Sequence, residues 1–123
     1  MGKPSFVKFE VPKAVTDKVY QAVELASTSG KIRRGVNETT KAIERSIAKL
    51  VVIAEDVTPE EILMHLPVVC NEKRVPFVYV PSKMDLGKAS GIGVPTSSLA
   101  IVEEGEAKKV IADLAATLKT LNK

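Results

Sequence analysis

The apolar residues of this chain recur at spacings that alternate between those of helices and those of strands. Pro12 suits the first turn of a helix, and the apolar positions after it form one helical stripe until Ser29 and Gly30 interrupt it. These positions are Val15, Val19, Ala22, Val23 and Ala26. The same spacing predicts a last helix. Its apolar positions are Ala107, Val110, Ile111, Leu114, Leu118 and Leu121.

Four shorter segments predict strands. Residues 50–54 form a continuous apolar run with β-branched character, which is typical of a strand that is covered on both faces. Residues 75–80 and residues 99–102 are two further apolar runs of strand length. Residues 31–34 predict a short, basic edge strand, and Gly35 ends it.

Turn and capping residues predict further helices between these strands. One is expected over residues 37–48. Another is expected to open at residues 58–61, with a threonine cap, a proline at the first position and a glutamate that completes a capping box. Pro67 is expected to break or kink that helix. Asp85 can start a short helix that fails at glycines 91 and 93.

The order of these elements predicts an α/β fold, a three-layer α-β-α sandwich with a mixed sheet of about four strands. A chain of 123 residues is large enough to bury a core, and it contains no repeat, low-complexity tract or interdomain linker. Residues 1–123 are therefore expected to form a single domain.

The composition predicts a soluble globular protein of a reducing compartment, with the cytoplasm as the expected location. Apolar residues make up 45% of the chain, but no apolar run approaches the roughly 20 residues of a membrane helix. The amino terminus lacks the apolar core of a signal peptide. Cys70, the single cysteine, is expected in the core, and His65, the single histidine, on a helix surface or half-buried. Together they cannot complete a four-ligand zinc site, so no metal or cofactor is expected.

The net charge of +3 is distributed in blocks. Residues 31–49 hold six basic and two acidic residues, residues 50–72 hold five acidic residues and no Lys or Arg, and residues 73–91 are basic again. Two basic blocks on either side of an acidic one favour a face that binds a polyanion. An ordinary solvated surface explains the same pattern equally well. Glu55 and Asp56 are interpreted as turn residues, not as catalytic carboxylates.

The predicted helix after Gly35 places four polar side chains on one side. With a helical rotation of 100° per residue, they lie within an arc of about 100°. They are Asn37, Glu38, Lys41 and Arg45. Ile43 and Ile47 point about 200–240° away from Lys41 and are expected to anchor the helix to the sheet. The polar set can donate to guanine O6 and N7 and accept from a base amino or imino proton.

Glu38 distinguishes two interpretations of this helix. A purely electrostatic phosphate binder has no use for a carboxylate, whereas a protein that reads base edges does. The structural alternative is that Asn37 is an ordinary helix cap and that the helix dipole favours Glu38. The helix alone leaves both interpretations open.

A glycine-rich segment at residues 87–95 is the second candidate site. It contains neither a phosphate-binding P-loop nor a dinucleotide-binding fingerprint. Ile92, Val94 and Pro95 are apolar residues in this loop, and such residues can pack against an unstacked base of single-stranded RNA. The alternative is that Ile92 and Val94 enter the core at the start of the last strand.

Residues 35–41 have the sequence Gly-Val-Asn-Glu-Thr-Thr-Lys, which resembles the G-x-N-E-x-x-K signature of a kink-turn-binding family, that of the archaeal ribosomal protein L-seven-Ae and its eukaryotic relatives. The likeness continues in order through residues 44–45, 50–57, 75–83 and 86–89 and the Gly-Ile-Gly-Val-Pro loop at residues 91–95. It covers nearly the whole chain, with no departure at the key positions.

This resemblance implies a ribosomal type of RNA-binding protein that recognises and scaffolds RNA and is not an enzyme. Members of the family bind kink-turns, RNA elements with a three-nucleotide bulge beside tandem sheared G·A pairs. The implied guanine readers are Asn37, Glu38 and Lys41, beside Gly35. The residues implied to cover a flipped-out bulge base are Ile92, Val94 and Pro95. The wider candidates for phosphate contacts are Lys31, Arg33, Arg34, Arg45, Lys83 and Lys88.

The implied partners are the kink-turn RNAs of the large ribosomal subunit, of box C/D and H/ACA guide complexes and of ribonuclease P, together with proteins of the guide and ribonuclease P complexes. These partners imply roles in rRNA binding, ribosome biogenesis and tRNA processing. The free protein is expected to be a monomer.

Three alternatives remain beside this function. A small nuclease or nucleotide hydrolase on the same scaffold would need a general base or a metal cluster, which the sequence does not offer in a recognisable form. An adaptor that binds only proteins would not need Asn37, Glu38 and Lys41 together. A family neighbour that is restricted to one ribosomal site, or to termination-codon recoding, is a closer alternative.

Overall fold

A four-stranded sheet lies at the centre of the computed structural model, which describes residues 11–57 and 63–121. Its strands are β1 (Lys31–Arg34), β2 (Leu50–Ala54), β3 (Phe77–Val80) and β4 (Ser98–Glu103), in the spatial order β1-β4-β2-β3. β2 and β3 are parallel, whereas β4 is antiparallel to both β1 and β2. The mixed sheet that the sequence predicts is therefore confirmed.

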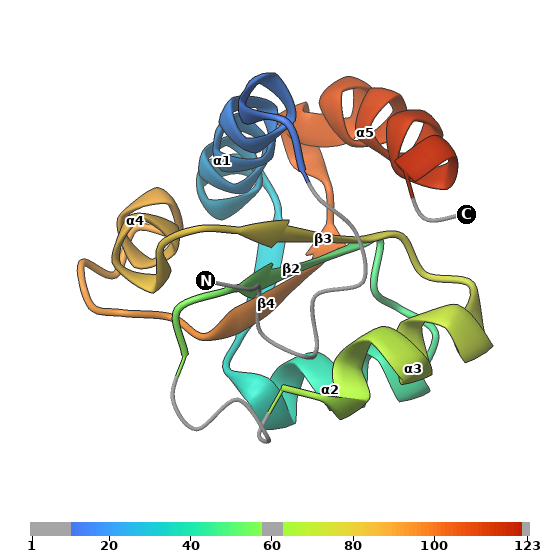
Figure 1. Cartoon of the computed structure of the whole chain (residues 1–123). Coiled ribbons are helices and arrows are strands. Elements are labelled where there is room, and N and C mark those ends of the chain that lie inside the picture. The colour runs from blue at the N-terminus through green and yellow to red at the C-terminus, as the bar shows by residue number, and fades with distance from the viewer. Residues whose placement is uncertain (1–10, 58–62, 122–123) are drawn as a thin grey trace.

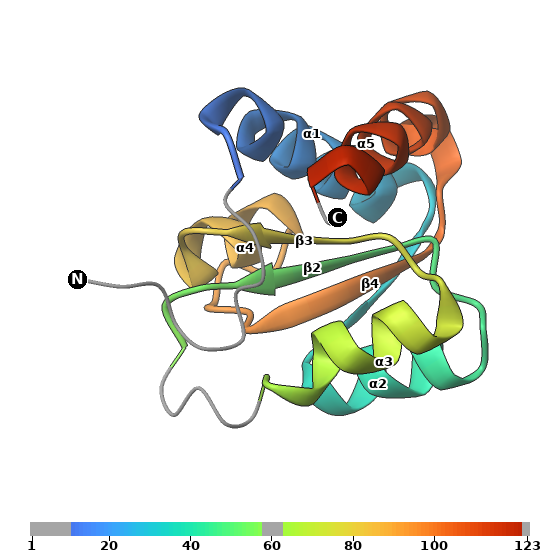
Figure 2. The ribbon, with the colours of Figure 1, turned by 45° about the vertical axis from the view of Figure 1, so that its right-hand side comes forward.

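Helices cover both faces of this sheet (Figure 1, Figure 2). α1 (Lys13–Ser29) and α5 (Lys108–Leu121), which follows the short 3-10 helix η2 (Gly105–Ala107), lie over one face. α2 (Val36–Glu44) and α3 (His65–Lys73) lie over the other face, and α4 (Lys83–Ala89) packs beside α1. This arrangement confirms the three-layer α-β-α sandwich. Within the described part of the chain, no helix is both long enough and apolar enough to cross a membrane.

The predicted apolar positions form the core between the layers. Every residue of β2 is buried, as expected of a strand with helices on both sides. The buried residues of the two helices over one face include Val19, Ala22, Val23, Ala26, Ile111, Leu114 and Leu118. Cys70 is buried as a small core residue, and this burial raises the pKa of its thiol to about 12.

α2 ends at Glu44, earlier than the predicted end at residue 48. Ser46 adopts the left-handed conformation with a φ of 59°, and the N–H groups of Ser46 and Ile47 donate to carbonyls of the last helical turn. These bonds close the helix in a Schellman motif. Ile47 has therefore left the helix and is 40% exposed, so the prediction that it anchors α2 was wrong, whereas Ile43 is fully buried as predicted.

Pro67 does not break α3. It lies in the first turn, where a missing N–H group removes no bond within the helix, and the helix continues past it to Lys73. Within α3 itself, Pro67 therefore causes no break, whereas the predicted break or kink concerns a longer helix. The helix start that the sequence predicts at residues 58–61 lies outside the described residues.

α4 begins before Asp85, the residue that the sequence proposes as its start. Ser82 caps the helix, because its Oγ accepts a hydrogen bond of 3.1 Å from the N–H of Asp85. The helix ends at Ala89, ahead of the glycines, as predicted. Asp56 in the turn after β2 accepts a bond of 2.8 Å from the N–H of Lys83, and so ties that turn to the first residue of α4.

Candidate functional site

The exposed face of α2 carries the four polar residues that the sequence places together. They are Asn37, Glu38, Lys41 and Arg45, and all four are exposed. An ion pair of 3.7 Å joins Glu38 Oε2 to Lys41 Nζ, and about half of each side chain is still accessible to solvent. Because such an exposed pair adds little stability, both groups can exchange this partner for a ligand at little cost.

Gly35 determines how α2 begins. Its φ of 94° and ψ of 159° are essentially restricted to glycine, and its N–H donates at 2.9 Å to the carbonyl of Ser98 on β4. No side chain caps the helix at this end. Asn37 lies inside the first turn, so the alternative in which it is an ordinary cap was wrong.

The opposite side of α2 is fixed to the sheet. Thr39 and Ile43 are buried against β4, and the Oγ of Ser98 donates to the Oγ1 of Thr39 at 3.5 Å. α3 packs beside α2, where the Oγ1 of Thr40 and the Nε2 of His65 lie 2.9 Å apart. His65 is exposed, as predicted. These contacts give the polar face of α2 a fixed position on the sheet.

The loop that follows α4 is held against that helix by backbone contacts. The N–H of Ile92 donates to the Gly87 carbonyl at 3.3 Å, and the N–H of Thr96 donates to the Lys83 carbonyl at 3.0 Å. Gly87 also packs so closely that a Cβ atom at this position would clash with the carbonyl oxygen of Val94. The loop is therefore built on α4 and has little freedom to move away from it.

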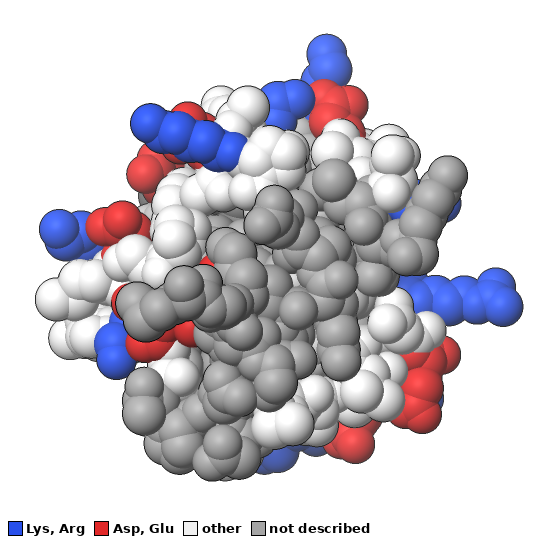
Figure 3. Space-filling view, in the orientation of Figure 1, with Lys and Arg blue, Asp and Glu red and all other residues white. Residues whose placement is uncertain are grey.

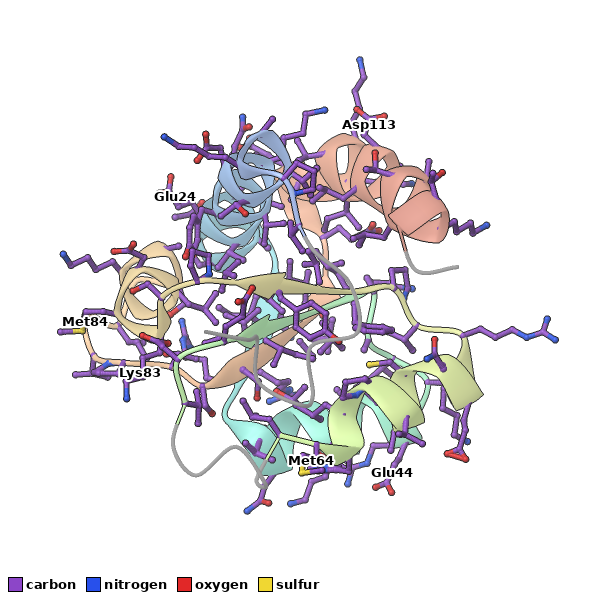
Figure 4. The ribbon with its side chains drawn as sticks, viewed as in Figure 1. Glu24, Glu44, Met64, Lys83, Met84 and Asp113 are labelled. Atoms are coloured by element: carbon purple, nitrogen blue, oxygen red, sulfur yellow. The ribbon has the colours of Figure 1, made fainter. Side chains whose placement is uncertain are left out.

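The loop presents its apolar residues to solvent. Ile92 is 39% exposed, Val94 is 55% exposed, and Pro95 is exposed as well. The alternative in which Ile92 and Val94 fill the core was therefore wrong. Met84, which the sequence analysis did not identify, is 47% exposed beside Lys83 on α4 (Figure 4). Apolar side chains that gather on a surface in this way are typical of an interaction site.

Arg34 connects this loop to the start of α2. It directly precedes Gly35, and its Nη2 donates at 2.6 Å to the carbonyl of Ser90, 56 positions further along the chain. Figure 1 shows the segment between α4 and β4 and the first turn of α2 at the same end of the molecule. The structure thus brings the two candidate segments together, through a bond that no local sequence pattern indicates.

The remaining basic candidates are spread over several elements. Lys88 is exposed in the last turn of α4, and Arg45 is exposed at the end of α2. Lys31 lies at the far end of β1 from α2 and forms an ion pair of 3.4 Å with Glu103. On the face shown in Figure 3, the coloured Lys and Arg side chains lie around the rim, several of them beside Asp or Glu.

The chemistry of the site is that of hydrogen bonding and apolar contact. Asn37 and Lys41 offer donors and Glu38 offers an acceptor, so α2 can pair with the polar edge of a planar ring. The exposed apolar side chains of the loop can cover the face of such a ring. Among residues 11–57 and 63–121, no three His, Cys, Asp or Glu side chains are grouped as metal ligands.

Comparison with known proteins gives a family for this chain. Residues 17–111 match the model of the ribosomal protein L7Ae/L30e/S12e/Gadd45 family, and this range includes all four strands and α2, α3 and α4. A solved structure, the Giardia lamblia 15.5kD RNA binding protein, is similar to this chain with a TM-score of 0.89 and 32% sequence identity, over 98% of this chain and 99% of that one. This chain belongs to the ribosomal protein L7Ae/L30e/S12e/Gadd45 family.

Proposed function

We propose that this protein binds RNA and that its preferred ligand is the kink-turn with its sheared G·A pairs. The observation that carries the proposal is the polar face of α2 at the same end of the molecule as an exposed apolar loop. The similar Giardia lamblia protein is named as an RNA binding protein, which supports the coarser part of the proposal.

The polar face of α2 reads the guanines of the sheared pairs. In this proposal Asn37 and Lys41 donate to guanine acceptors, and the Glu38 carboxylate accepts from a base amino or imino group. All three side chains are exposed on a helix whose other side is fixed to β4. A fixed position suits base recognition, because a hydrogen-bonding pattern is read only when donors and acceptors are held in register.

The loop covers a base that has left the stack of the RNA. Ile92, Val94 and Pro95 form an apolar surface that packs on the face of the flipped-out bulge nucleotide. Lys31, Arg45 and Lys88 are the proposed contacts to phosphates of the RNA. Because the site fits the bent RNA, binding shifts the RNA towards that form.

The biological setting follows from the family resemblance in the sequence. We propose one domain, monomeric when free, that works in the cytoplasm as a recognition module and not as an enzyme. Its RNA partners in this proposal are ribosomal RNA, box C/D and H/ACA guide RNA and ribonuclease P RNA. The protein partners of those complexes are proposed to bind outside the RNA site.

A mobility-shift titration tests the proposal with three RNAs at one salt concentration. They are a kink-turn, the same RNA with its G·A pairs replaced by Watson–Crick pairs, and a plain duplex of equal length. We expect the kink-turn to bind far more tightly than either control, because a duplex hides its base edges in a groove that side chains cannot read. Equal affinity for the three RNAs at matched salt would refute kink-turn recognition and leave non-specific RNA binding.

A further inference from the structure

Arg34 is placed in the structure unlike the other basic candidates. It alternates with exposed residues along β1 and is itself half-buried, and its Nη2 donates at 2.6 Å to the Ser90 carbonyl. Its Nε is buried and, within the described part of the chain, has no hydrogen-bond partner. Lys88 and Arg45, by contrast, are exposed.

This burial argues against a phosphate contact for Arg34. Its Nη2 donates to the Ser90 carbonyl, and its Nε is removed from solvent. To reach a phosphate, the guanidinium would first have to break the bond to Ser90. The bond is charge-assisted, which makes it stronger than a neutral hydrogen bond. The guanidinium of Arg34 is therefore held by contacts within the protein.

The bond joins the two halves of the proposed RNA site. Arg34 is followed by Gly35, at which α2 begins, and Ser90 is followed by the loop that carries Ile92 and Val94. The Ser90 side chain is turned away from this contact, because its Oγ donates to the Gly87 carbonyl at 2.8 Å. Ser90 is thus bonded to α4 through its side chain and, through its carbonyl, to Arg34 just ahead of α2.

We propose that Arg34 is a positioning residue, which sets where the apolar loop lies relative to the base-reading face of α2. The inference rests on the proposed function and deepens it. Arg34 does not touch the RNA; it holds Ser90, and through Ser90 it places Ile92 and Val94 over the flipped-out base while α2 reads the neighbouring guanines. Loss of Arg34 therefore weakens contact with that one base and leaves the number of phosphate contacts unchanged.

The test uses two kink-turns that differ at one nucleotide, one with a base at the flipped-out position and one that is abasic there. For the parent chain we expect the abasic RNA to bind about fivefold or more weakly, since contact with one base is worth at least that much. Arg34→Met removes the donors and keeps the length of the side chain. Lys88→Met removes the same charge from an exposed position and is the matched control. Melting curves establish that each variant is folded.

We expect Arg34→Met to bring the ratio between the two RNAs to within about twofold of unity, with the salt dependence of the affinity unchanged. Lys88→Met should leave the ratio intact and lower the slope of log affinity against log salt by about one contact. Arg34→Lys should not restore the ratio, because an ammonium on a shorter stem does not reproduce the planar fork of arginine. Because Arg34→Lys keeps the charge, it serves as the test variant if Arg34→Met does not fold.

The inference is overturned if Arg34→Met behaves as Lys88→Met does, or if Arg34→Lys restores the parent in full. A parent chain that binds the two kink-turns equally would refute the role of the loop and the inference with it. A parent chain that prefers neither kink-turn to a duplex would refute the proposed function itself, which is a separate result.

Discussion

At the scale of single residues, Glu38 is the position where base recognition and simple charge attraction predict opposite results. Its carboxylate is half accessible and lies 3.7 Å from the Lys41 ammonium. RNA is a polyanion, so electrostatics alone makes any surface carboxylate unfavourable for binding. A carboxylate that accepts from a base proton instead adds affinity and selectivity.

Glu38→Ala should therefore weaken kink-turn binding by about 1–3 kcal/mol, the usual worth of a good base contact, although it removes a negative charge. Glu44→Ala is the matched control, because Glu44 is an exposed carboxylate at the other end of the same helix and is not one of the proposed guanine contacts. It should bind as well as the parent or slightly better. Titration of both variants with kink-turn RNA measures this difference. If Glu38→Ala bound as tightly as Glu44→Ala, base reading by Glu38 would be refuted.

Cys70 contributes stability that is lost in alkaline solution. Burial raises the pKa of its thiol from 9.0 to about 12, so the unfolded chain releases this proton at a lower pH than the folded chain. The contribution is fully present below pH 9 and declines between pH 9 and 12, by about 1.4 kcal/mol per pH unit. From pH 8 to 10, the free energy of unfolding should therefore fall by about 1 kcal/mol more for the parent than for Cys70→Ala. Urea denaturation under reducing conditions measures both, and parallel declines would contradict a buried thiol.

The roles of single residues were predictable where they follow from helical geometry, and not where they depend on tertiary contacts. Helical spacing predicts that Asn37, Glu38 and Lys41 share one exposed face, because the angle between positions is a property of the helix itself. The contact between Arg34 and Ser90 joins positions 56 apart and depends on how α4 packs beside the end of β1. No periodic pattern carries that information.

At the scale of elements, apolar periodicity predicts the helices and strands, while their ends follow from backbone conformation at single residues. The last turn of α2 shows the difference. The apolar spacing runs on through Ile47, but Ser46 takes a positive φ of 59° and ends the helix. Positive φ is uncommon for a serine, so its residue type did not indicate the end of the helix. Likewise, Pro67 is compatible with α3 because the helix begins at His65, close enough to place it in the first turn.

Because α2 ends before Ile47, Ile43 and Ile47 should contribute differently to the free energy of unfolding. Ile43→Ala should lower the free energy of unfolding by about 2–5 kcal/mol, since it leaves a cavity under α2 where the side chain is fully buried. Ile47→Ala should cost less than about 1 kcal/mol, because 40% of that residue is already exposed. Chemical denaturation of both variants decides the matter. Similar losses would mean that Ile47 anchors the helix after all.

At the scale of the whole molecule, the proposed RNA site lies at one end of the sandwich and draws on both of its helical layers. α2 comes from one layer, α4 and its loop from the other, and β1 lies between them (Figure 1). In the proposed complex, the RNA therefore meets charges from several elements. Their combined effect is best measured as a salt dependence, which counts the phosphates that the protein neutralises.

Lys88→Ala should weaken binding to all RNAs by a similar factor and lower the salt slope by about one, as the loss of one phosphate contact does. Lys109→Ala is the matched control, because Lys109 is an exposed lysine on α5, away from α4 and its loop. It changes the net charge equally and should leave the slope unchanged. Affinities for a kink-turn and a duplex over a series of salt concentrations give both slopes. A preference for the kink-turn that changed in Lys88→Ala would make Lys88 a base reader instead.

The strand order has a consequence for the synthesis of this protein. β4 lies between β1 and β2, so β1 has no strand partner, and α2 no β4 to rest on, until residues 98–103 have been made. Every residue proposed to contact RNA is translated before that point. A nascent chain on the ribosome therefore already contains the complete set of RNA contacts but cannot assemble them. Binding of RNA through the proposed contacts therefore has to wait for β4, which carries none of them. Completion of the sheet thus delays RNA binding relative to translation.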